Sequence, residues 1–216
     1  MKYVVLDLEM CKVPKGNRHN FRHSRETIQI GAVLLDEQYE IIDKFSTYVQ
    51  PEFGAIDSYI GNLTGIGKRD VKDAPLMAAA LKTFIDWMPA EELRCVSWSD
   101  SDKTQIEHEA EAKNIEIDRL PELLENWIDC QKMFGDKMHT GAAYSLEEAL
   151  IASDIYQEGR AHDGLTDAYN TALLFQKISI NPDFELNEVY KSAKEENVEH
   201  LGFSMGELFS NIRISE

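Results

Sequence analysis

Asp7 and Glu9 are two carboxylates separated by a single residue, near the start of a 216-residue sequence. They end a short, β-branched apolar run, Tyr3-Val4-Val5-Leu6, of the kind that forms a buried strand. Residues two apart on a strand point to the same face, so both side chains are expected to project together from the core. Burying two like charges is unfavourable unless a cation neutralises them. The pair therefore indicates a divalent-metal site, with one simpler alternative, that Glu9 lies past the strand end in water.

A metal site predicts further carboxylates, and Asp100 and Asp102 are the first to appear. They follow a second apolar run, residues 93–98, which also has the character of a buried strand. Asp102 opens a predicted helix, about 102–113, where the helix dipole favours negative charge. The plain alternative is that both are ordinary acids at the start of a helix.

The segment from Arg160 to Ala172 supplies a third group. His162 stands just ahead of a predicted helix, and Asp167 lies within about its first turn. The two are therefore expected near one another, at the positive end of the helix. Alternatively, Asp163 or Asp167 merely caps the helix and His162 is a surface residue.

The elements that must position these residues follow from the hydrophobic pattern, which runs from strands to an alternation of helices and strands. Such an order predicts a mixed sheet with helices on its faces. After the first strand, the expected strands are 27–35, 39–49, 93–98 and a short one at 127–129. The expected helices are 67–72, 75–88, 102–113, 144–153 and 163–178, with Ser145 and Glu148 as a capping box. Residues 51–67 are expected to be loop with at most a helical turn, and residues 135–141 are expected to be loop.

Length and composition indicate one domain, residues 1–180, followed by a strongly charged, helix-prone extension, residues 181–216, packed on or beside it. There are 39 acidic and 22 basic residues, giving a formal charge of −17. This argues against broad electrostatic binding to long nucleic acid, but it leaves room for a small phosphate site built around metal ions. The three cysteines have no metal-ligand spacing, and no apolar stretch is long enough to span a bilayer. We therefore expect a soluble, unprocessed, cytoplasmic protein.

One segment reverses the acidic character of the chain. Residues 10–25 contain five basic side chains and no acid, and Pro14 and Gly16 indicate a loop. The segment is either a solvated loop without a role, or a flexible basic rim that guides a phosphate backbone toward the carboxylates.

Together the motifs resemble those of a known family, the DEDDh 3′–5′ exonucleases, a DnaQ-like and RNase H-related group. The resemblance covers roughly residues 2–178 and rests on Asp7-Leu8-Glu9, on an aspartate after a strand in the middle of the chain, and on His162 with four residues before Asp167. Leu63-Thr64-Gly65-Ile66 and Tyr144 to Leu150 also match in character. The segments 7–10 and 98–102 look most like the branch that holds the KapD and histone-mRNA exonucleases. The resemblance implies an α/β fold with an RNase H-like mixed β-sheet, an antiparallel three-strand meander plus parallel strands flanked by helices.

The resemblance also implies a chemistry. Asp7, Glu9, Asp102 and Asp167 would hold two divalent metal ions, Mg²⁺ or Mn²⁺, which hard oxygen ligands suit. Asp102 is favoured over Asp100 because Ile106 follows it by four residues, as in the family's second motif. His162 would take a proton from the attacking water, since an imidazole titrates near neutral pH. The expected product is a nucleoside 5′-monophosphate from the 3′ end of single-stranded RNA or DNA.

In the family that the motifs resemble, the residue after the first-motif glutamate and the Leu-Thr-Gly segment contact the terminal nucleotide. The resemblance therefore implies substrate contacts for Met10, Leu63 and Thr64. Leu63 is also explained as a plain core residue. Glu26 is either an ordinary surface charge or a carboxylate that supports the metal ligands without touching the metal. Two other functions stay open: a regulatory or interaction protein on an exonuclease scaffold, similar to a sporulation inhibitor, and a metal-dependent phosphatase. The oligomeric state is not predicted.

Overall fold

The computed structural model describes residues 1–138 and 143–187. The chain divides into two compact units, Met1–Glu185 and Leu186–Glu216. The first unit runs slightly past the predicted boundary at residue 180, because Phe184 is buried and its ring packs against Phe134 at 6.3 Å between centroids. Apart from residues 181–187, the predicted C-terminal extension lies outside the described residues.

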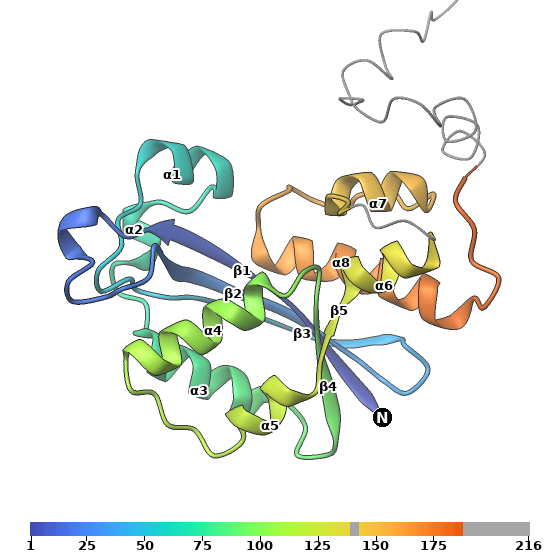
Figure 1. Ribbon diagram of the computed structural model, residues 1–216, viewed down its shortest axis with the longest axis horizontal. Helices are drawn as coiled ribbons and strands as arrows, with labels where there is room; N and C mark the ends of the chain where they lie inside the picture. Colours follow the sequence, from blue (N-terminus) through green and yellow to red (C-terminus); the bar gives the residue numbers. More distant parts are fainter. Residues whose placement is uncertain (139–142, 188–216) are drawn as a thin grey trace, which may run out of the picture. The chain divides into compact units, whose positions relative to one another are not determined.

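A five-stranded mixed sheet forms the centre of the first unit (Figure 1). The strands are β1 (Lys2–Lys12), β2 (Arg25–Leu35), β3 (Ile41–Tyr48), β4 (Leu93–Ser97) and β5 (Trp127–Asp129). Their order is β3-β2-β1-β4-β5, so β1 is the middle strand. The pairs β1–β2 and β2–β3 are antiparallel, whereas β1–β4 and β4–β5 are parallel. The predicted meander followed by parallel strands is confirmed.

Eight α-helices are described: α1 (Ser58–Thr64), α2 (Lys68–Val71), α3 (Met77–Trp87), α4 (Ser101–Ala112), α5 (Leu120–Glu125), α6 (Cys130–Lys137), α7 (Leu146–Ala152) and α8 (Gly164–Ile180). A short 3₁₀ turn spans Lys15–Asn17. The predicted capping box of α7 is present: Ser145 Oγ accepts from Glu148 N at 3.2 Å, and Glu148 Oε2 accepts from Ser145 N at 2.8 Å.

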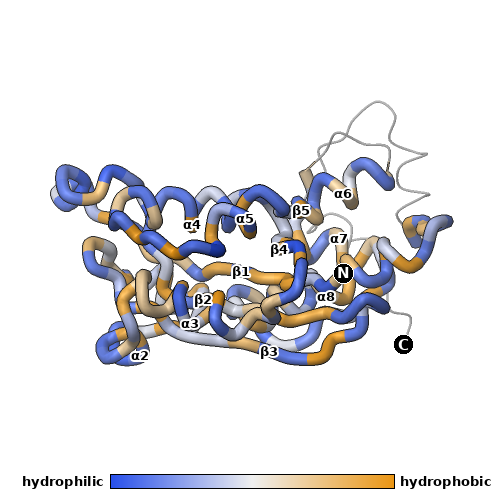
Figure 2. The backbone as a smooth tube through the Cα atoms, turned by 90° about the horizontal axis from the view of Figure 1, so that it is seen from below, coloured by the Kyte–Doolittle hydropathy of each residue, from blue (hydrophilic) through white to orange (hydrophobic). Residues whose placement is uncertain are grey.

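The side chains of β1 alternate between two hydrophobic cores. Val4, Leu6 and Leu8 face a cluster that includes side chains of α3, α4 and α5. Val5 faces the other cluster, with Ala172 and Phe175 of α8. Because both faces of the strand are covered, residues 3–11 are apolar apart from Asp7 and Glu9, and Figure 2 shows the hydrophobic course of the strand through the interior of the unit. By the same alternation, Asp7 and Glu9 lie on the α8 face.

Two regions differ from the predicted loops. Residues 58–64 form α1, which Asp57 caps by accepting from Ile60 N at 2.9 Å and which ends at Gly65 with a φ of 77°. Residues 130–137 form α6, directly after β5, although 135–141 was predicted as a loop. The residues that cap these two helices are close to them in the sequence, but a glycine within each segment weakens the helical signal in the sequence.

None of the helices in the described ranges combines the length and the apolar character that crossing a membrane requires.

Candidate active site

Asp7 and Glu9 are held on the central strand opposite two residues of β2, since Asp7 pairs with Gly31 and Glu9 with Gln29. Glu9 is 7% exposed, so it does not lie in open water beyond the strand. Gly31 has no side chain, and a Cβ there would lie 2.1 Å from the backbone of Gly164. The start of α8 is therefore seated directly against the strand pair that carries the two carboxylates.

The N-terminus of α8 places Asp167 and His162 beside this strand pair. Asp163 caps the helix by accepting from Thr166 N at 3.0 Å, while Gly164 N donates to Gln29 Oε1 at 3.0 Å. Asp167 Oδ2 accepts from His162 N at 2.9 Å. This hydrogen bond holds His162 in a left-handed conformation, with a φ of 61°, which turns the chain sharply into the helix.

Asp102 reaches the same place from α4. It lies in the first turn of that helix, is 4% exposed, and accepts from Leu8 N of β1 at 3.1 Å through its Oδ1. Asp100, the alternative ligand, is exposed at the N-cap of α4. The buried position of Asp102 favours it as the metal ligand.

The five residues converge although they come from three distant parts of the sequence. One ligand atom each from Glu9, His162 and Asp167 lie within 4.8 Å of one another. Asp7 lies on the same face of β1 as Glu9, and Asp102 accepts a hydrogen bond from the N of Leu8, which lies between them, so both residues adjoin this group.

The electrostatics of this group favour protonation or a cation. Burial, followed by the charges of Asp102 and Glu9, raises the pKa of Asp7 well above its usual range. Burial raises the pKa of Glu9 to about 8, with contributions from Asp167, Asp163 and Asp102, and Arg160 opposes this rise. Burial also raises the pKa of Asp102 to about 7 and is the largest cause of the raised pKa of Asp167.

This donor set fits divalent metal ions. Within the described residues, no Lys, Arg or His makes an ion pair at 4.0 Å or less with Asp7, Glu9, Asp102 or Asp167. Clustered carboxylates without a cationic partner are stable at neutral pH only if something else neutralises them. Carboxylate oxygens are hard ligands of the kind that bind divalent ions, so the residues present fit a divalent-metal site.

Comparison with known proteins decides the family. The family model for RNase T, described as an exonuclease, matches residues 4–175, which include all five residues of the site. The chain belongs to this exonuclease family. The membership that the motifs predicted is thereby confirmed.

Relatives of the RNase T exonuclease family support the assignment over most of the chain. ERI1 exoribonuclease 2 of Homo sapiens is 31% identical over 202 residues, which cover 81% of this chain and 28% of the relative. The protein of the same name from Danio rerio is 32% identical over 187 residues, 74% of this chain and 32% of the relative. This chain thus spans less than a third of the length of these relatives.

Solved structures share the fold. The nuclease domain of 3′hExo, a DEDDh family member bound to rAMP, superposes with a TM-score of 0.71 at 24% identity, covering 87% of this chain and 96% of that domain. Escherichia coli exonuclease I in complex with a dT13 oligonucleotide gives a TM-score of 0.62 at 14% identity, covering 81% of this chain and 40% of the enzyme. The predicted RNase H-like fold class is confirmed.

The predicted substrate contacts lie in different environments. Met10 is partly buried against the larger hydrophobic cluster, and Leu63 is partly buried at the end of α1. Thr64 is 4% exposed, and its hydroxyl donates to Ile60 O at 2.9 Å and accepts from Ile66 N at 3.0 Å. The Thr64 hydroxyl therefore stabilises the end of its own helix, which leaves Leu63 and Met10 as the more accessible members of this group.

Arg160 is a site residue that the sequence reasoning did not single out. Its guanidinium donates to Asn62 O and to Leu63 O, so it ties the C-terminal end of α1 to the loop that carries His162. Its charge also lowers the pKa of Glu9. The available signal was its position two residues before His162, within the same segment.

Glu26 has a different role from either of the two predicted for it. It is fully buried, and its carboxylate accepts from the backbone N of Glu52, Phe53 and Gly54. Lys113 Nζ lies 2.6 Å from Glu26 Oε1 and 2.8 Å from Glu109 Oε2. Glu26 is therefore not a surface charge, and its support goes to the 52–54 loop and the end of α4 rather than to the four carboxylates of the site.

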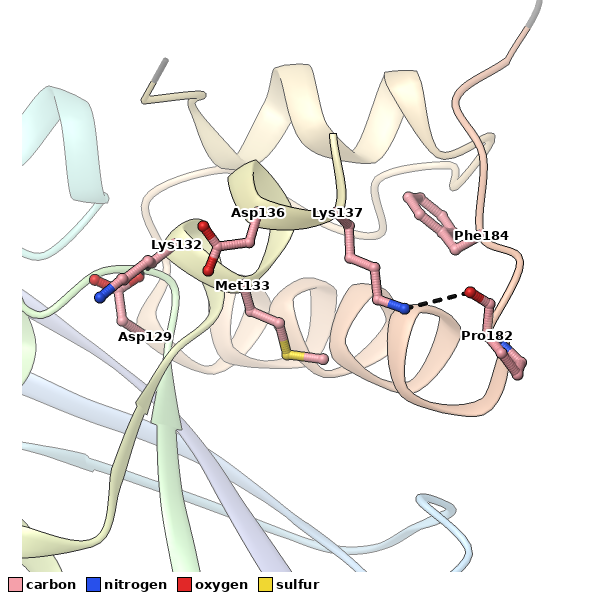
Figure 3. A pocket seen from close by; sticks show the side chains of 7 residues that line it. All are labelled: Asp129, Lys132, Met133, Asp136, Lys137, Pro182 and Phe184. Atoms are coloured by element: carbon pink, nitrogen blue, oxygen red, sulfur yellow. Dashed lines mark hydrogen bonds between the residues drawn. The ribbon is translucent and has the colours of Figure 1, made fainter. Parts of the chain in front are cut away.

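A cavity of about 590 Å³ lies elsewhere, between α6 and the residues that follow α8 (Figure 3). Lys137 and Phe184 line it, and Lys137 Nζ donates to Pro182 O at 3.4 Å. None of the five site residues lines this cavity.

Proposed function

We propose that this chain is a metal-dependent 3′–5′ exonuclease that hydrolyses phosphodiester bonds at the 3′ ends of single-stranded RNA or DNA and releases nucleoside 5′-monophosphates. The observation that carries the proposal is the convergence of Asp7, Glu9, Asp102, Asp167 and His162 within a family of exonucleases. Relatives of this chain are exoribonucleases, which supports nucleic acid as the substrate class.

Asp7, Glu9, Asp102 and Asp167 would hold two divalent ions, Mg²⁺ or Mn²⁺. When bound, such ions neutralise charge on the scissile phosphate and lower the pKa of a water molecule. His162 would accept the proton that the attacking water gives up, because its ring lies beside Glu9 and Asp167 and its side chain is exposed to solvent. The hydrogen bond from His162 N to Asp167 orients that ring relative to the carboxylates.

Arg160 adds a positioning function. Since it holds Leu63 O at 3.1 Å and also lies near Glu9, it fixes the distance between the α1 segment and the reacting groups. Met10, Leu63 and Thr64 would line the place of the terminal nucleotide, with apolar contacts that tolerate any base. We place the activity in a reducing, cytoplasmic setting, because all three cysteines are free and buried.

The test uses single-stranded RNA and DNA of one sequence, labelled at the 5′ end and incubated with the full chain and Mn²⁺. The expected result is a ladder that shortens from the 3′ end, with nucleoside 5′-monophosphates as the released product and no cleavage when EDTA is present. Asp167→Asn is the control variant and should leave the substrate intact. Internal cuts, shortening from the 5′ end, or hydrolysis of phosphomonoesters alone would contradict the proposal, the last of these in favour of a phosphatase.

A further inference from the structure

A second cluster of charged side chains lies next to the carboxylates and has the opposite sign. We define the basic strip as Lys12, Lys15, Arg18, Arg22 and Arg25, all of which are exposed. No acid interrupts residues 10–25, in a chain whose formal charge is −17. An exposed basic stretch on so acidic a molecule concentrates the attraction for anions in one place.

The strip is a folded feature rather than a loose loop. Val13 and Phe21 are buried, and Val13 N donates to Ser24 O at 2.9 Å. The Phe21 ring stacks on Phe53 at 5.5 Å between centroids, and Asn17 Nδ2 donates to Phe53 O at 2.8 Å. Because the backbone is already fixed, little ordering is required when a ligand binds.

The two ends of the strip, Lys12 and Arg25, lie on the strand pair that also carries Glu9. Lys12 follows Glu9 by three residues on the same strand, a distance of about 10 Å at the rise of a β-strand. Arg25 pairs with Lys12 across the sheet, and its carbonyl accepts from Gln105 Nε2 of α4 at 3.2 Å. Figure 1 shows the connection between these two strands at the end of β1, close to α1 and α2.

An exposed aromatic ring completes the surface. Tyr59 of α1 is 61% exposed, although a large aromatic side chain is usually more buried, and Lys12 Nζ lies 5.0 Å from the centre of its ring. A ring open to solvent beside a cation is the combination that binds a base and a phosphate of single-stranded nucleic acid.

Most of the cations in the basic strip make no ion pair with a carboxylate of the protein. Arg22 is paired with Glu111, but among the described residues Lys12, Lys15, Arg18 and Arg25 make no ion pair. Charges that serve only solubility in an acidic protein would gain by pairing with some of its many carboxylates. These four instead remain available to an external anion.

We propose that the basic strip and Tyr59 form a binding site for single-stranded nucleic acid upstream of the 3′-terminal nucleotide, in which the cations contact successive phosphates and Tyr59 stacks on a base. The upstream direction rests on the proposed exonuclease function. The binding itself does not, since it is a property of the strip alone.

The proposal predicts a limited dependence on salt. Each phosphate contact to a single strand contributes about −0.7 to the slope of log K against log salt, so contacts by the four cations that make no ion pair give a slope of about −2.8. Nonspecific binding to a more extended cationic surface would give a steeper salt slope, and binding by the metal site alone would give a shallower one.

The experiment measures the affinity of the full chain for a fluorescent single strand of about twelve nucleotides and for a dinucleotide, across a salt series. Ca²⁺ replaces Mn²⁺, and gels confirm that the strands stay intact. Lys15→Ala combined with Arg18→Ala should make the slope less steep by about 1.4 and should weaken the long strand more than the dinucleotide. Lys15→Ala alone is the milder variant and should reduce the slope by about 0.7.

Lys132→Ala is the matched control, because Lys132 is an exposed lysine on α6, on the opposite side of the unit from the strip in Figure 1. It should bind the long strand as the unsubstituted chain does. The proposal is overturned if the double variant keeps the original slope and affinity, or if the dinucleotide is weakened as much as the long strand. A chain that binds in this way but does not hydrolyse would refute the proposed function and leave this inference standing.

Tyr59 has its own test. Tyr59→Ala should weaken the long strand about tenfold with little change of the salt slope, whereas Tyr59→Phe should bind normally because stacking needs only the ring. Equal affinity of the alanine and phenylalanine variants would remove Tyr59 from the site.

Discussion

His162 has a backbone conformation that few residues tolerate. Its φ of 61° lies in the left-handed region, which is unfavourable by about 1–2 kcal/mol for most side chains and less so for Asn. The hydrogen bond to Asp167 stabilises this conformation. A substitution that removes the imidazole should therefore be chosen so that it does not also disturb the turn.

His162→Asn is the variant that meets this condition. It should reduce the rate of 3′-end hydrolysis by about 10²–10⁴-fold, the usual contribution of a general base, while the melting temperature stays the same. Single-turnover hydrolysis and thermal unfolding measure the two effects. His108→Asn, which removes a histidine whose ring stacks on His23, is the control and should keep its rate. A fully active His162→Asn would exclude this residue as the proton acceptor.

Asp100 and Asp102 form a natural pair for comparison, since they differ mainly in burial. Even partners that only orient a metal ligand change activity or affinity by about 10–100-fold, so Asp102→Asn should lower the Mn²⁺-dependent rate at least that much. The amide oxygen can still accept from Leu8 N, which preserves the fold. Asp100→Asn should remain as active as the unsubstituted chain, and the reverse ranking would transfer the ligand role to Asp100.

At the scale of the elements, the sequence predicted the strands and the helices that carry the site because their signals are local. Alternation and apolar runs identify β1, β2 and β4, and the acids at the starts of α4 and α8 mark helix N-termini. Helix α1 was predicted as no more than a helical turn and α6 was missed, because each is short and carries a glycine, Gly61 or Gly135, which weakens the helical signal although the caps are local. Arg160 was missed for a different reason, since its partners lie about one hundred residues away along the sequence.

The contact of α8 with the sheet gives a prediction for an element. Gly31→Ala would place a Cβ 2.1 Å from the backbone of Gly164 and Leu165, which forces the start of α8 away from β1. We expect a loss of about 1–3 kcal/mol in unfolding free energy and a larger loss of activity, because Asp167 and His162 move with the helix.

Gly16→Ala is the matched control, since an added Cβ there meets nothing within 4 Å. Urea unfolding of both variants measures the difference, and Gly16→Ala should stay within about 0.5 kcal/mol of the unsubstituted chain. Equal stability of the two variants would contradict close packing of the start of α8 against β2.

For the molecule as a whole, the acid cluster links stability to pH and to metal ions. The carboxyl pKa values of Glu9 and Asp102 are raised to about 8 and about 7, so the folded state binds protons more tightly than the unfolded state does. The contribution of these two groups to stability in EDTA should therefore be complete below the ordinary carboxyl pKa and should be lost as the pH rises through about 7 to 8. Mg²⁺ or Mn²⁺ should remove most of this fall, since the ions neutralise the same charges.

Urea unfolding at a series of pH values, with EDTA and with Mg²⁺, tests this link. Glu9→Gln should flatten the pH profile in EDTA and reduce the stabilisation by metal. A metal-free chain whose stability does not change between pH 5 and pH 8 would contradict the raised pKa values and, with them, the fit of the site to divalent ions.

The central position of β1 has a consequence for how the enzyme would fail on heating. Its amides bond to β2 on one side and to β4 on the other along its N-terminal half, so they should be among the last in the unit to exchange with deuterium. His162 instead sits on an exposed turn at the start of α8, where local fraying begins. Mild heating should therefore release His162 while Asp7 stays in place, and, if His162 has its proposed role, activity should decline reversibly before the protein denatures.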